Sequence, residues 1–173
     1  MQTNNRKPES FIAAMEPMSV SDVEAALAAA GIETTITLFS ESTATSAEAA
    51  EQIGCELGQI AKSLAFLIDG EPIVVLASGD VMIDDRKLAS HFGVGRKKVK
   101  AAKPEQLLEI YGYVPGAMPP LGHRTAGLRT FLDTSLQRFD QLYASGGAVN
   151  AIFPVSLPTL QAATGGQFES FAR

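Results

Sequence analysis

Hydrophobic and polar residues follow one another along the chain in patterns that predict strands and helices, and the clearest pattern is a hairpin. Residues 63–68, SLAFLI, have the composition and spacing of a strand. Asp69-Gly70 is a pair that favours the tight turn of a β-hairpin. Residues 73–77, IVVLA, form a continuous apolar run, which is typical of a strand buried on both faces. This segment therefore predicts a hairpin whose second strand is buried.

A short helix is predicted immediately before the hairpin. Thr45-Ser46-Ala47-Glu48 matches the capping box, in which the Thr oxygen accepts a backbone N–H and the Glu reaches back to the cap. Apolar residues follow at helical spacing as far as Ile53, and residues 54–58 form a connector that contains two glycines. The order helix, connector, strand places Lys62 where the first hairpin strand begins, at the mouth of an apolar hairpin.

The other elements are predicted from helix caps and β-branched runs. A second capping box, Ser21 to Glu24, starts a helix that Gly31 ends in a left-handed conformation. Asp84 or Asp85 caps a helix to Phe92, and three further residues mark the starts or ends of later helices. Those residues are Pro104 and Gly112, which bound one helix, and Ser156, which caps the last. Strands are expected over residues 34–39, 97–101, 129–134, 141–144 and 149–155.

The mixture of helices and strands shows no strict βαβ alternation, which favours an α+β domain with a largely antiparallel β-sheet, either open or closed. A chain of 173 residues suffices for one domain with a substantial core. Residues 1–18 are polar, with weak periodicity, and we expect a flexible N-terminal arm there. Residues 19–173 are expected to form the single domain. Residues 116–122 are too rich in Gly and Pro for a regular element and predict a shaped loop.

Composition places the chain among ordinary globular proteins, with 46% hydrophobic and 19% charged residues. No apolar run approaches the ~20 residues of a membrane span, and the N-terminal segment lacks the apolar core of a secretion signal. We therefore expect a cytoplasmic protein without a membrane partner. Cys55 is the single cysteine, and neither His91 nor His123 lies in a ligand-spaced motif, so no metal site is expected.

Common catalytic motifs are absent from the sequence. It contains no Gly-x-Ser-x-Gly elbow, no phosphate-binding loop ending in Gly-Lys-Ser/Thr and no dinucleotide fingerprint after a strand. The pair Asp84-Asp85 fits a helix cap better than an acid/base dyad. The familiar nucleophile and nucleotide-binding classes are thereby excluded.

The charge distribution suggests a local basic patch. The net charge is −5, which argues against indiscriminate binding of nucleic acid. Residues 86–103 nevertheless contain half of the 14 basic residues and no acidic residue. A solvated face and a phosphate-binding patch both explain this cluster, and the second would suit one end of an RNA. The residues concerned are Arg86, Lys87, Arg96, Lys97, Lys98, Lys100 and Lys103.

Three segments, in this order, resemble the YbaK-type aminoacyl-tRNA editing domains, which include a domain inserted in or separate from bacterial prolyl-tRNA synthetases. They are SAEAAEQIGCELGQIAKSL, which ends just after Lys62; Gly-Ala-Met-Pro-Pro at 116–120; and Tyr-Ala-Ser-Gly-Gly at 143–147. The resemblance as a whole extends over residues 20 to 165 approximately. The resemblance implies a small mixed barrel ringed by helices.

The resemblance also implies a site. Lys62 and Gly116 would act in catalysis, the lysine because an ammonium near the ester carbonyl favours the negative charge of a tetrahedral intermediate. Without the resemblance, Lys62 reads as a surface lysine and the glycine loop as a connector. Substrate-binding residues would be Ser63, Ala117, Met118, Pro119, Pro120, Ser145, Gly146 and Gly147.

One segment departs from the family pattern. Some relatives carry an acid or a histidine just after the small-residue loop, whereas residues 148–151 here are Ala, Val, Asn and Ala. A side-chain general base is therefore in doubt, and a bound water or the substrate's own groups would carry protons.

The sequence thus predicts a stand-alone aminoacyl-tRNA deacylase without a cofactor, which hydrolyses the ester of mischarged tRNA for proline carrying a small amino acid. Prolyl-tRNA synthetase is a candidate partner. A non-catalytic tRNA-binding or synthetase-associated module of the same fold is the alternative, and a small-molecule-binding domain would leave the basic cluster unexplained. We also expect the missing side chain of Gly116 to leave room that selects the amino acid.

Overall fold

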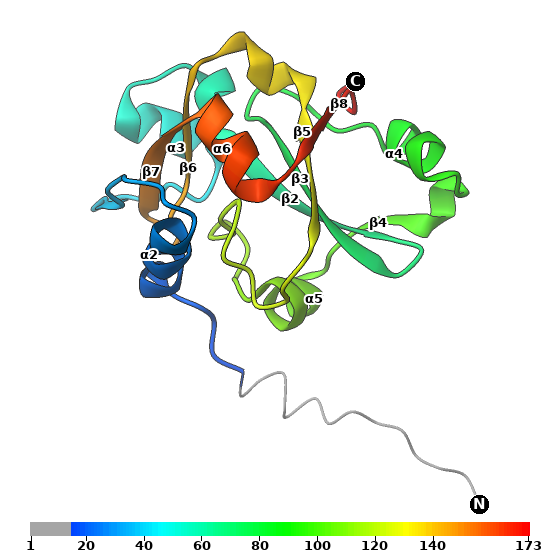
Figure 1. Ribbon diagram of the computed structural model, residues 1–173, viewed down its shortest axis with the longest axis horizontal. Coiled ribbons are helices and arrows are strands. Elements are labelled where there is room, and N and C mark those ends of the chain that lie inside the picture. The colour runs from blue at the N-terminus through cyan, green and yellow to red at the C-terminus, as the bar shows by residue number, and fades with distance from the viewer. Residues whose placement is uncertain (1–14) are drawn as a thin grey trace, which may run out of the picture.

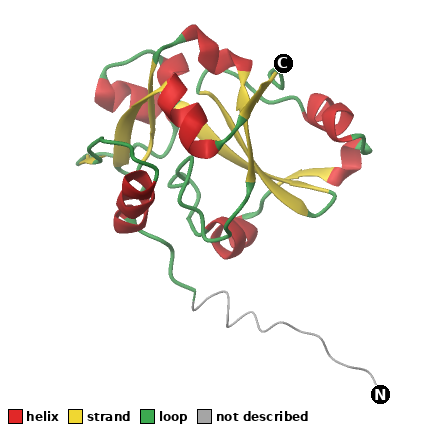
Figure 2. Cartoon of the chain, viewed as in Figure 1, coloured by secondary structure: helices red, strands yellow, loops and turns green. Residues whose placement is uncertain are grey.

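The computed structural model describes residues 15–173, and it has the α+β architecture expected from the sequence (Figures 1 and 2). Its helices lie around two sheets. The helices are α2 (Val20–Ala29), α3 (Ser46–Ile53), α4 (Asp85–Phe92), α5 (Pro104–Gln106) and α6 (Leu157–Thr164). The strands are β1 (Thr37–Leu38), β2 (Ala61–Ile68), β3 (Glu71–Ser78), β4 (Val99–Ala101), β5 (Arg129–Asp133), β6 (Gln141–Ser145), β7 (Ala151–Ser156) and β8 (Gln167–Glu169).

The larger sheet is mixed and has the order β4-β2-β3-β5-β8. β2 pairs antiparallel with β3 and β4, whereas β5 runs parallel to both β3 and β8. The smaller sheet, β1-β7-β6, is antiparallel throughout. A bridge between Ile60 and Tyr143 joins the two sheets at the start of β2. The beginning of β2 therefore lies where the sheets meet.

The central hairpin confirms the prediction from the sequence. Asp69 and Gly70 both have positive φ angles, 49° and 84°, as the two-residue turn of a right-twisted hairpin requires. Side chains of β3 alternate between two apolar clusters. Val74 and Leu76 pack in the main core between the sheets, and Val75 packs with Leu88 of α4 on the other face. β3 is thus buried on both faces.

Helix ends follow the predicted caps, with one correction. Thr45 caps α3, Asp84 caps α4 and Ser156 caps α6, each accepting a backbone N–H in the first turn. The capping box of α2 is formed by Ser19 and Asp22 rather than by Ser21 and Glu24. Met18, the residue before this cap, donates its N–H to the carbonyl oxygen of Gly112 at 2.7 Å.

Short strands were the least predictable elements. Only Thr37 and Leu38 of the expected strand over residues 34–39 pair with β7, and residues 96–98 form a 3₁₀ turn before β4. β8 was not expected, since three residues after a double glycine carry no periodic signal, and its pairing with β5 alone makes it a strand. The helix predicted to end at Gly112 begins as α5 and continues as a π-helical turn over Leu107–Tyr111.

The expected N-terminal arm lies mostly outside the described residues, which begin at residue 15. Its last residues are attached to the domain. Arg124 Nη2 donates to the carbonyl oxygen of Glu16 at 2.6 Å, and Met18 is bonded to Gly112. Residues 16 and 18, within the arm expected over residues 1–18, therefore contact the domain.

Candidate functional site

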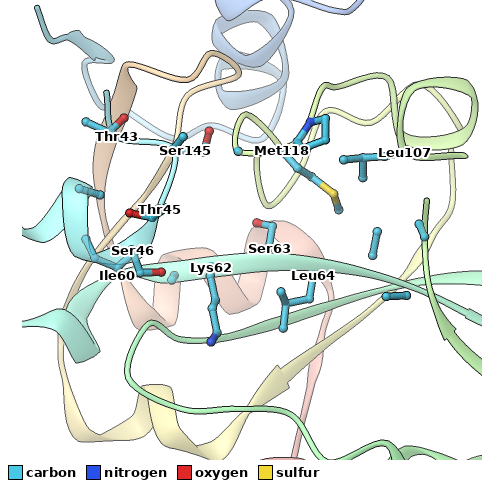
Figure 3. Close-up of a pocket in the computed structure, with 18 of the residues that line it drawn as sticks. Thr43, Thr45, Ser46, Ile60, Lys62, Ser63, Leu64, Leu107, Met118 and Ser145 are labelled. Atoms are coloured by element: carbon cyan, nitrogen blue, oxygen red, sulfur yellow. The ribbon is translucent and has the colours of Figure 1, made fainter. Parts of the chain in front are cut away.

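A cavity of about 400 Å³ lies beside the first half of β2 (Figure 3). Its walls come from the segment that leads into α3, from β2, from Leu107, from the glycine loop at residues 115–118 and from Ser145 at the end of β6. Cavities of this size hold small ligands in proteins. The elements that meet here are far apart in the sequence, and the cavity exists because the two sheets join at Ile60.

The edge of β2 that borders the cavity is unpaired. The carbonyl oxygen of Ala65 accepts the N–H of Ala102 at 2.9 Å, so the backbone groups of Ala65 point toward the β4 side. In an antiparallel strand, the N–H and C=O of every second residue point to the same side, and those of Ser63 therefore face the same edge. β4 pairs only with Phe66 to Ile68. The peptide groups of Ser63 consequently face the cavity rather than a neighbouring strand.

The side chain of Ser63 points into the same region. In Figure 3 it rises from β2 toward Met118 and Ser145. Its hydroxyl oxygen is buried and has no hydrogen-bond partner among the described residues. Ser63 thus presents both its backbone edge and an unpartnered hydroxyl on this side.

Lys62 leaves β2 on the opposite side from Ser63 (Figure 3). Parts of the residue line the cavity, but its ammonium donates to the carbonyl oxygen of Val81, in the turn after β3. Burial lowers the pKa of Lys62, and the negative charges of Asp80 and Asp133 oppose that effect. From the sequence we expected the ammonium of Lys62 in the mouth of the cavity. In the structure it instead points toward Val81, where the charges of Asp80 and Asp133 act on it.

The two carboxylates near Lys62 have other partners as well. Asp80 receives two hydrogen bonds from Arg138, at 2.9 and 2.6 Å, and this contact holds the pKa of Asp80 below its usual value. Asp133 is fully buried and accepts the backbone N–H groups of Ser135, Phe171 and Ala172. The two carboxylates whose charges act on Lys62 therefore also make hydrogen bonds that stabilise the fold.

Gly116 is required for a close approach between two segments. It has a φ of 84°, and a Cβ built on it would lie 2.7 Å from the Cβ of Ala44 and 3.3 Å from the carbonyl oxygen of Ala44. The missing side chain therefore faces Ala44, in the segment before α3, and not the open cavity. The expectation that Gly116 leaves room for the amino acid was wrong, because Ala44 occupies the position that a side chain of residue 116 would take.

Hydrogen bonds to loop carbonyls fix the shape of the glycine loop. Ser145 Oγ donates to the carbonyl oxygen of Ala117 at 3.0 Å and accepts the N–H of Gly147 at 3.3 Å. His123 Nε2 lies 2.8 Å from the carbonyl oxygen of Pro119, and burial lowers the pKa of this histidine. The loop is thus held from behind by side chains, which keeps Met118 in the cavity wall.

A sequence profile of the aminoacyl-tRNA editing domain matches residues 40–163, which include every wall of this cavity. The chain belongs to this family. The uncharacterized protein YwhH of Bacillus subtilis is 36% identical over 120 residues, covering 69% of this chain and 74% of YwhH. A proline–tRNA ligase of Staphylococcus aureus is 30% identical over 98 residues, which are 57% of this chain and 17% of the ligase.

Solved structures agree with this membership. The crystal structure of a candidate trans-editing enzyme for prolyl-tRNA synthetase superposes with a TM-score of 0.82 at 32% identity, covering 89% of this chain and 96% of that one. A protein described as hypothetical superposes with a TM-score of 0.80 at 26% identity, covering 88% and 99%. The fold of an editing domain, expected from the three sequence segments, is confirmed.

Several residues expected to bind substrate lie behind the cavity wall of this editing domain. A Cβ on Gly146 would meet Ile36 at 2.5 Å, and one on Gly147 would meet Val23 at 2.7 Å, so both glycines allow close packing of other elements. Ala117, Pro119 and Pro120 are buried within the loop and are not among the residues that line the cavity. Of the expected set, Lys62, Ser63, Gly116, Met118 and Ser145 line it.

Other residues in the wall were not expected from the sequence. Residues 43–46 line the cavity because Ala44 packs against Gly116, and Leu107 lines it from the π-helical turn. The capping box marked the start of α3 correctly. No local signal indicated that this helix start faces a loop from the middle of the chain.

The basic cluster divides into two parts in the structure. Arg96 pairs with Asp85 at 2.9 Å, Lys98 pairs with Asp69 at 3.2 Å, and Lys87 Nζ donates to the carbonyl oxygen of Ala172 at 2.5 Å. Lys100 and Lys103 instead flank Ala101 and Ala102, which line the cavity. Within the basic cluster, Lys100 and Lys103 are therefore the residues adjacent in the chain to cavity-lining residues.

Two kinds of feature are absent from the part of the chain that begins at residue 15. No helix there is long and apolar enough to cross a membrane. Within the same residues, no group of three or more His, Cys, Asp or Glu side chains is placed to hold a metal ion.

Proposed function

We propose that this editing domain hydrolyses the ester bond of mischarged aminoacyl-tRNA as a free-standing protein, and that its substrate is tRNA for proline carrying a small amino acid. Family membership and the superposition with the candidate trans-editing enzyme support this proposal. The observation that carries it is the unpaired edge of β2 at Ser63, which borders a cavity of about 400 Å³.

The edge of β2 supplies the catalytic geometry in this proposal. The ester carbonyl oxygen would accept the backbone N–H of Ser63, a fixed donor that stabilises negative charge as it develops on that oxygen. Water adds to the carbonyl carbon, the bond to the ribose oxygen breaks, and the ribose oxygen leaves with a proton. The residues that line the cavity include no Asp, Glu or His, so the substrate's own amino group or ribose hydroxyl would relay the proton.

Lys62, the residue of β2 that precedes Ser63, would add a positive charge near the ester. Lys62 is among the residues that line the cavity, and its ammonium would exchange the carbonyl of Val81 for an oxygen of the terminal nucleotide. Lys100 and Lys103 would contact phosphates of the acceptor end, because they flank the cavity-lining residues 101 and 102. The tRNA would thus bind with its ester over β2 and the phosphate backbone of its acceptor end along β4 and α5.

The test is single-turnover deacylation of tRNA for proline charged with alanine, serine, cysteine or proline. We expect hydrolysis of at least one mischarged ester and sparing of prolyl-tRNA. Lys62→Ala should lower the rate about 100-fold or more, since removing one group that stabilises transition-state charge has this effect. Lys62→Arg should retain part of the activity, because it keeps a cation on a similar stem.

Circular dichroism of both Lys62 variants should show an unchanged fold. A folded Lys62→Ala protein with the wild-type rate would remove the lysine from the mechanism. Tight binding of tRNA without hydrolysis of any ester would favour the alternative, a non-catalytic tRNA-binding module of the same fold.

A further inference from the structure

The hydroxyl of Ser63 is buried and unpartnered, which is unusual for a polar group in a folded protein. Leaving a buried hydroxyl without a hydrogen bond costs roughly 1–3 kcal/mol. Three other hydroxyls of the wall have hydrogen-bond partners. Thr43 Oγ1 donates to the carbonyl of Val149, Thr45 Oγ1 accepts the N–H of Glu48, and Ser145 Oγ donates to the carbonyl of Ala117. A ligand in the cavity is thus a natural partner for Ser63.

The surroundings of Ser63 indicate which kind of group that partner is. Ala65, Leu107 and Met118 provide apolar surface on this side, and the cavity wall contains no acidic residue. An α-ammonium placed here would lose its hydration without gaining a counter-charge, which is costly. A neutral hydroxyl or thiol is satisfied by one serine, because the serine hydroxyl both donates and accepts. The chemistry therefore favours a neutral polar atom over the charged amino group.

We propose that Ser63 is a specificity-determining residue, whose hydroxyl bonds a hydroxyl or thiol on the side chain of the aminoacyl group. This inference rests on the proposed function and names its substrate class: esters of serine or cysteine are preferred over esters of alanine or 2-aminobutyrate. Met118, which faces Ser63 in Figure 3, covers this region in the absence of substrate. Its unbranched thioether side chain is able to move aside as the polar group enters.

The decisive comparison uses side chains of similar size. Seryl, cysteinyl and 2-aminobutyryl esters differ in the hydrogen-bonding atom far more than in volume. Wild-type protein should deacylate the seryl and cysteinyl esters of one tRNA about tenfold faster than the 2-aminobutyryl ester. Ser63→Ala should remove that ratio, mainly by slowing the first two.

Ser145→Ala is the matched control, because it deletes a hydroxyl of the same wall that holds the loop through Ala117. It should slow all the esters by a similar factor and leave the ratio unchanged. A uniform loss in Ser63→Ala, or no loss, would overturn the proposal and assign this hydroxyl to the fold or to the α-amino group.

A second measurement separates this inference from hydrolysis itself. Amide-linked seryl and alanyl analogues of the terminal adenosine cannot be hydrolysed, and calorimetry gives their affinities. A preference for the seryl analogue that Ser63→Ala abolishes supports the inference even if no ester is cleaved, in which case the proposed deacylase activity alone fails. Equal affinities of wild-type protein for the two analogues would contradict the specificity role.

Discussion

Gly116→Ala tests whether the cavity depends on a close approach between the glycine loop and the segment before α3. Two costs add. An L-residue at a φ of 84° is strained by about 1 kcal/mol, and its Cβ would lie 2.7 Å from the Cβ of Ala44, an overpacking that costs about 2 kcal/mol. The sum of about 3 kcal/mol corresponds to a fall in Tm of about 9 °C for a domain of this size.

The matched control is Gly127→Ala. Gly127 also has a positive φ, 72°, but nothing lies within 4 Å of its added Cβ. It should therefore show only the conformational cost, about 1 kcal/mol and about 3 °C. Thermal unfolding followed by circular dichroism gives both values, and the difference between the two variants isolates the contact with Ala44.

A compensating variant completes the test. Ala44→Gly removes the atom that the new Cβ meets. The double variant with Gly116→Ala should therefore regain most of the stability lost to this contact, whereas the loss due to the positive φ remains. Deacylation should fall for all esters alike in Gly116→Ala, because the loop moves as a unit. If Gly116→Ala destabilised no more than Gly127→Ala, or if Ala44→Gly gave no rescue, the close approach would not be what fixes the loop.

Two further predictions concern RNA binding and alkaline pH. Lys100→Ala combined with Lys103→Ala should reduce the slope of log affinity for tRNA against log salt by about two. Arg86→Ala combined with Lys87→Ala removes the same amount of charge from α4 and should leave this slope unchanged. Equal slopes for the two double variants would refute the assignment of the phosphate contacts to Lys100 and Lys103. Tyr111 is buried and donates to the carbonyl of Ile73 at 2.8 Å, and burial raises its pKa, so its share of stability is present below the ordinary tyrosine pKa of about 10 and is lost as pH rises above it. Urea unfolding should show this loss in the wild type and a shallower loss in Tyr111→Phe.

The sequence was sufficient for the elements whose signals are local. The hairpin turn at Asp69-Gly70 needs two residues that tolerate positive φ, and the caps at Thr45, Asp84 and Ser156 need a side-chain oxygen before a helix. Such signals depend on neighbours in the chain and survive in any fold. By contrast, β8 is a strand only because β5 lies beside it, and its three residues carry no pattern of their own.

The membership of the site was predictable only in part, and the orientations of its side chains were not predictable. The family resemblance located Lys62, Ser63 and Gly116 in one region, and the structure confirms that they line one cavity. Which face of β2 each side chain takes depends on register, because successive residues of a strand alternate between faces. Lys62 therefore turns toward Val81 while Ser63 meets the cavity. The filling of the space at Gly116 by Ala44 likewise depends on tertiary packing.

The alternation along β2 also separates two kinds of evolutionary constraint. Leu64 and Phe66 pack in the apolar cluster that contains Leu88 of α4, although they also border the cavity, so changes at these positions alter stability. The hydroxyl of Ser63 has no partner among the described residues, so under the proposed function a change there would alter what is bound. Neighbouring codons thus come under different selection. Under the proposed function, a lineage would acquire a new substrate by changing residue 63 while Leu64 and Phe66 preserve the packing against α4, which makes the start of β2 a place for relatives of the same architecture to diverge in specificity.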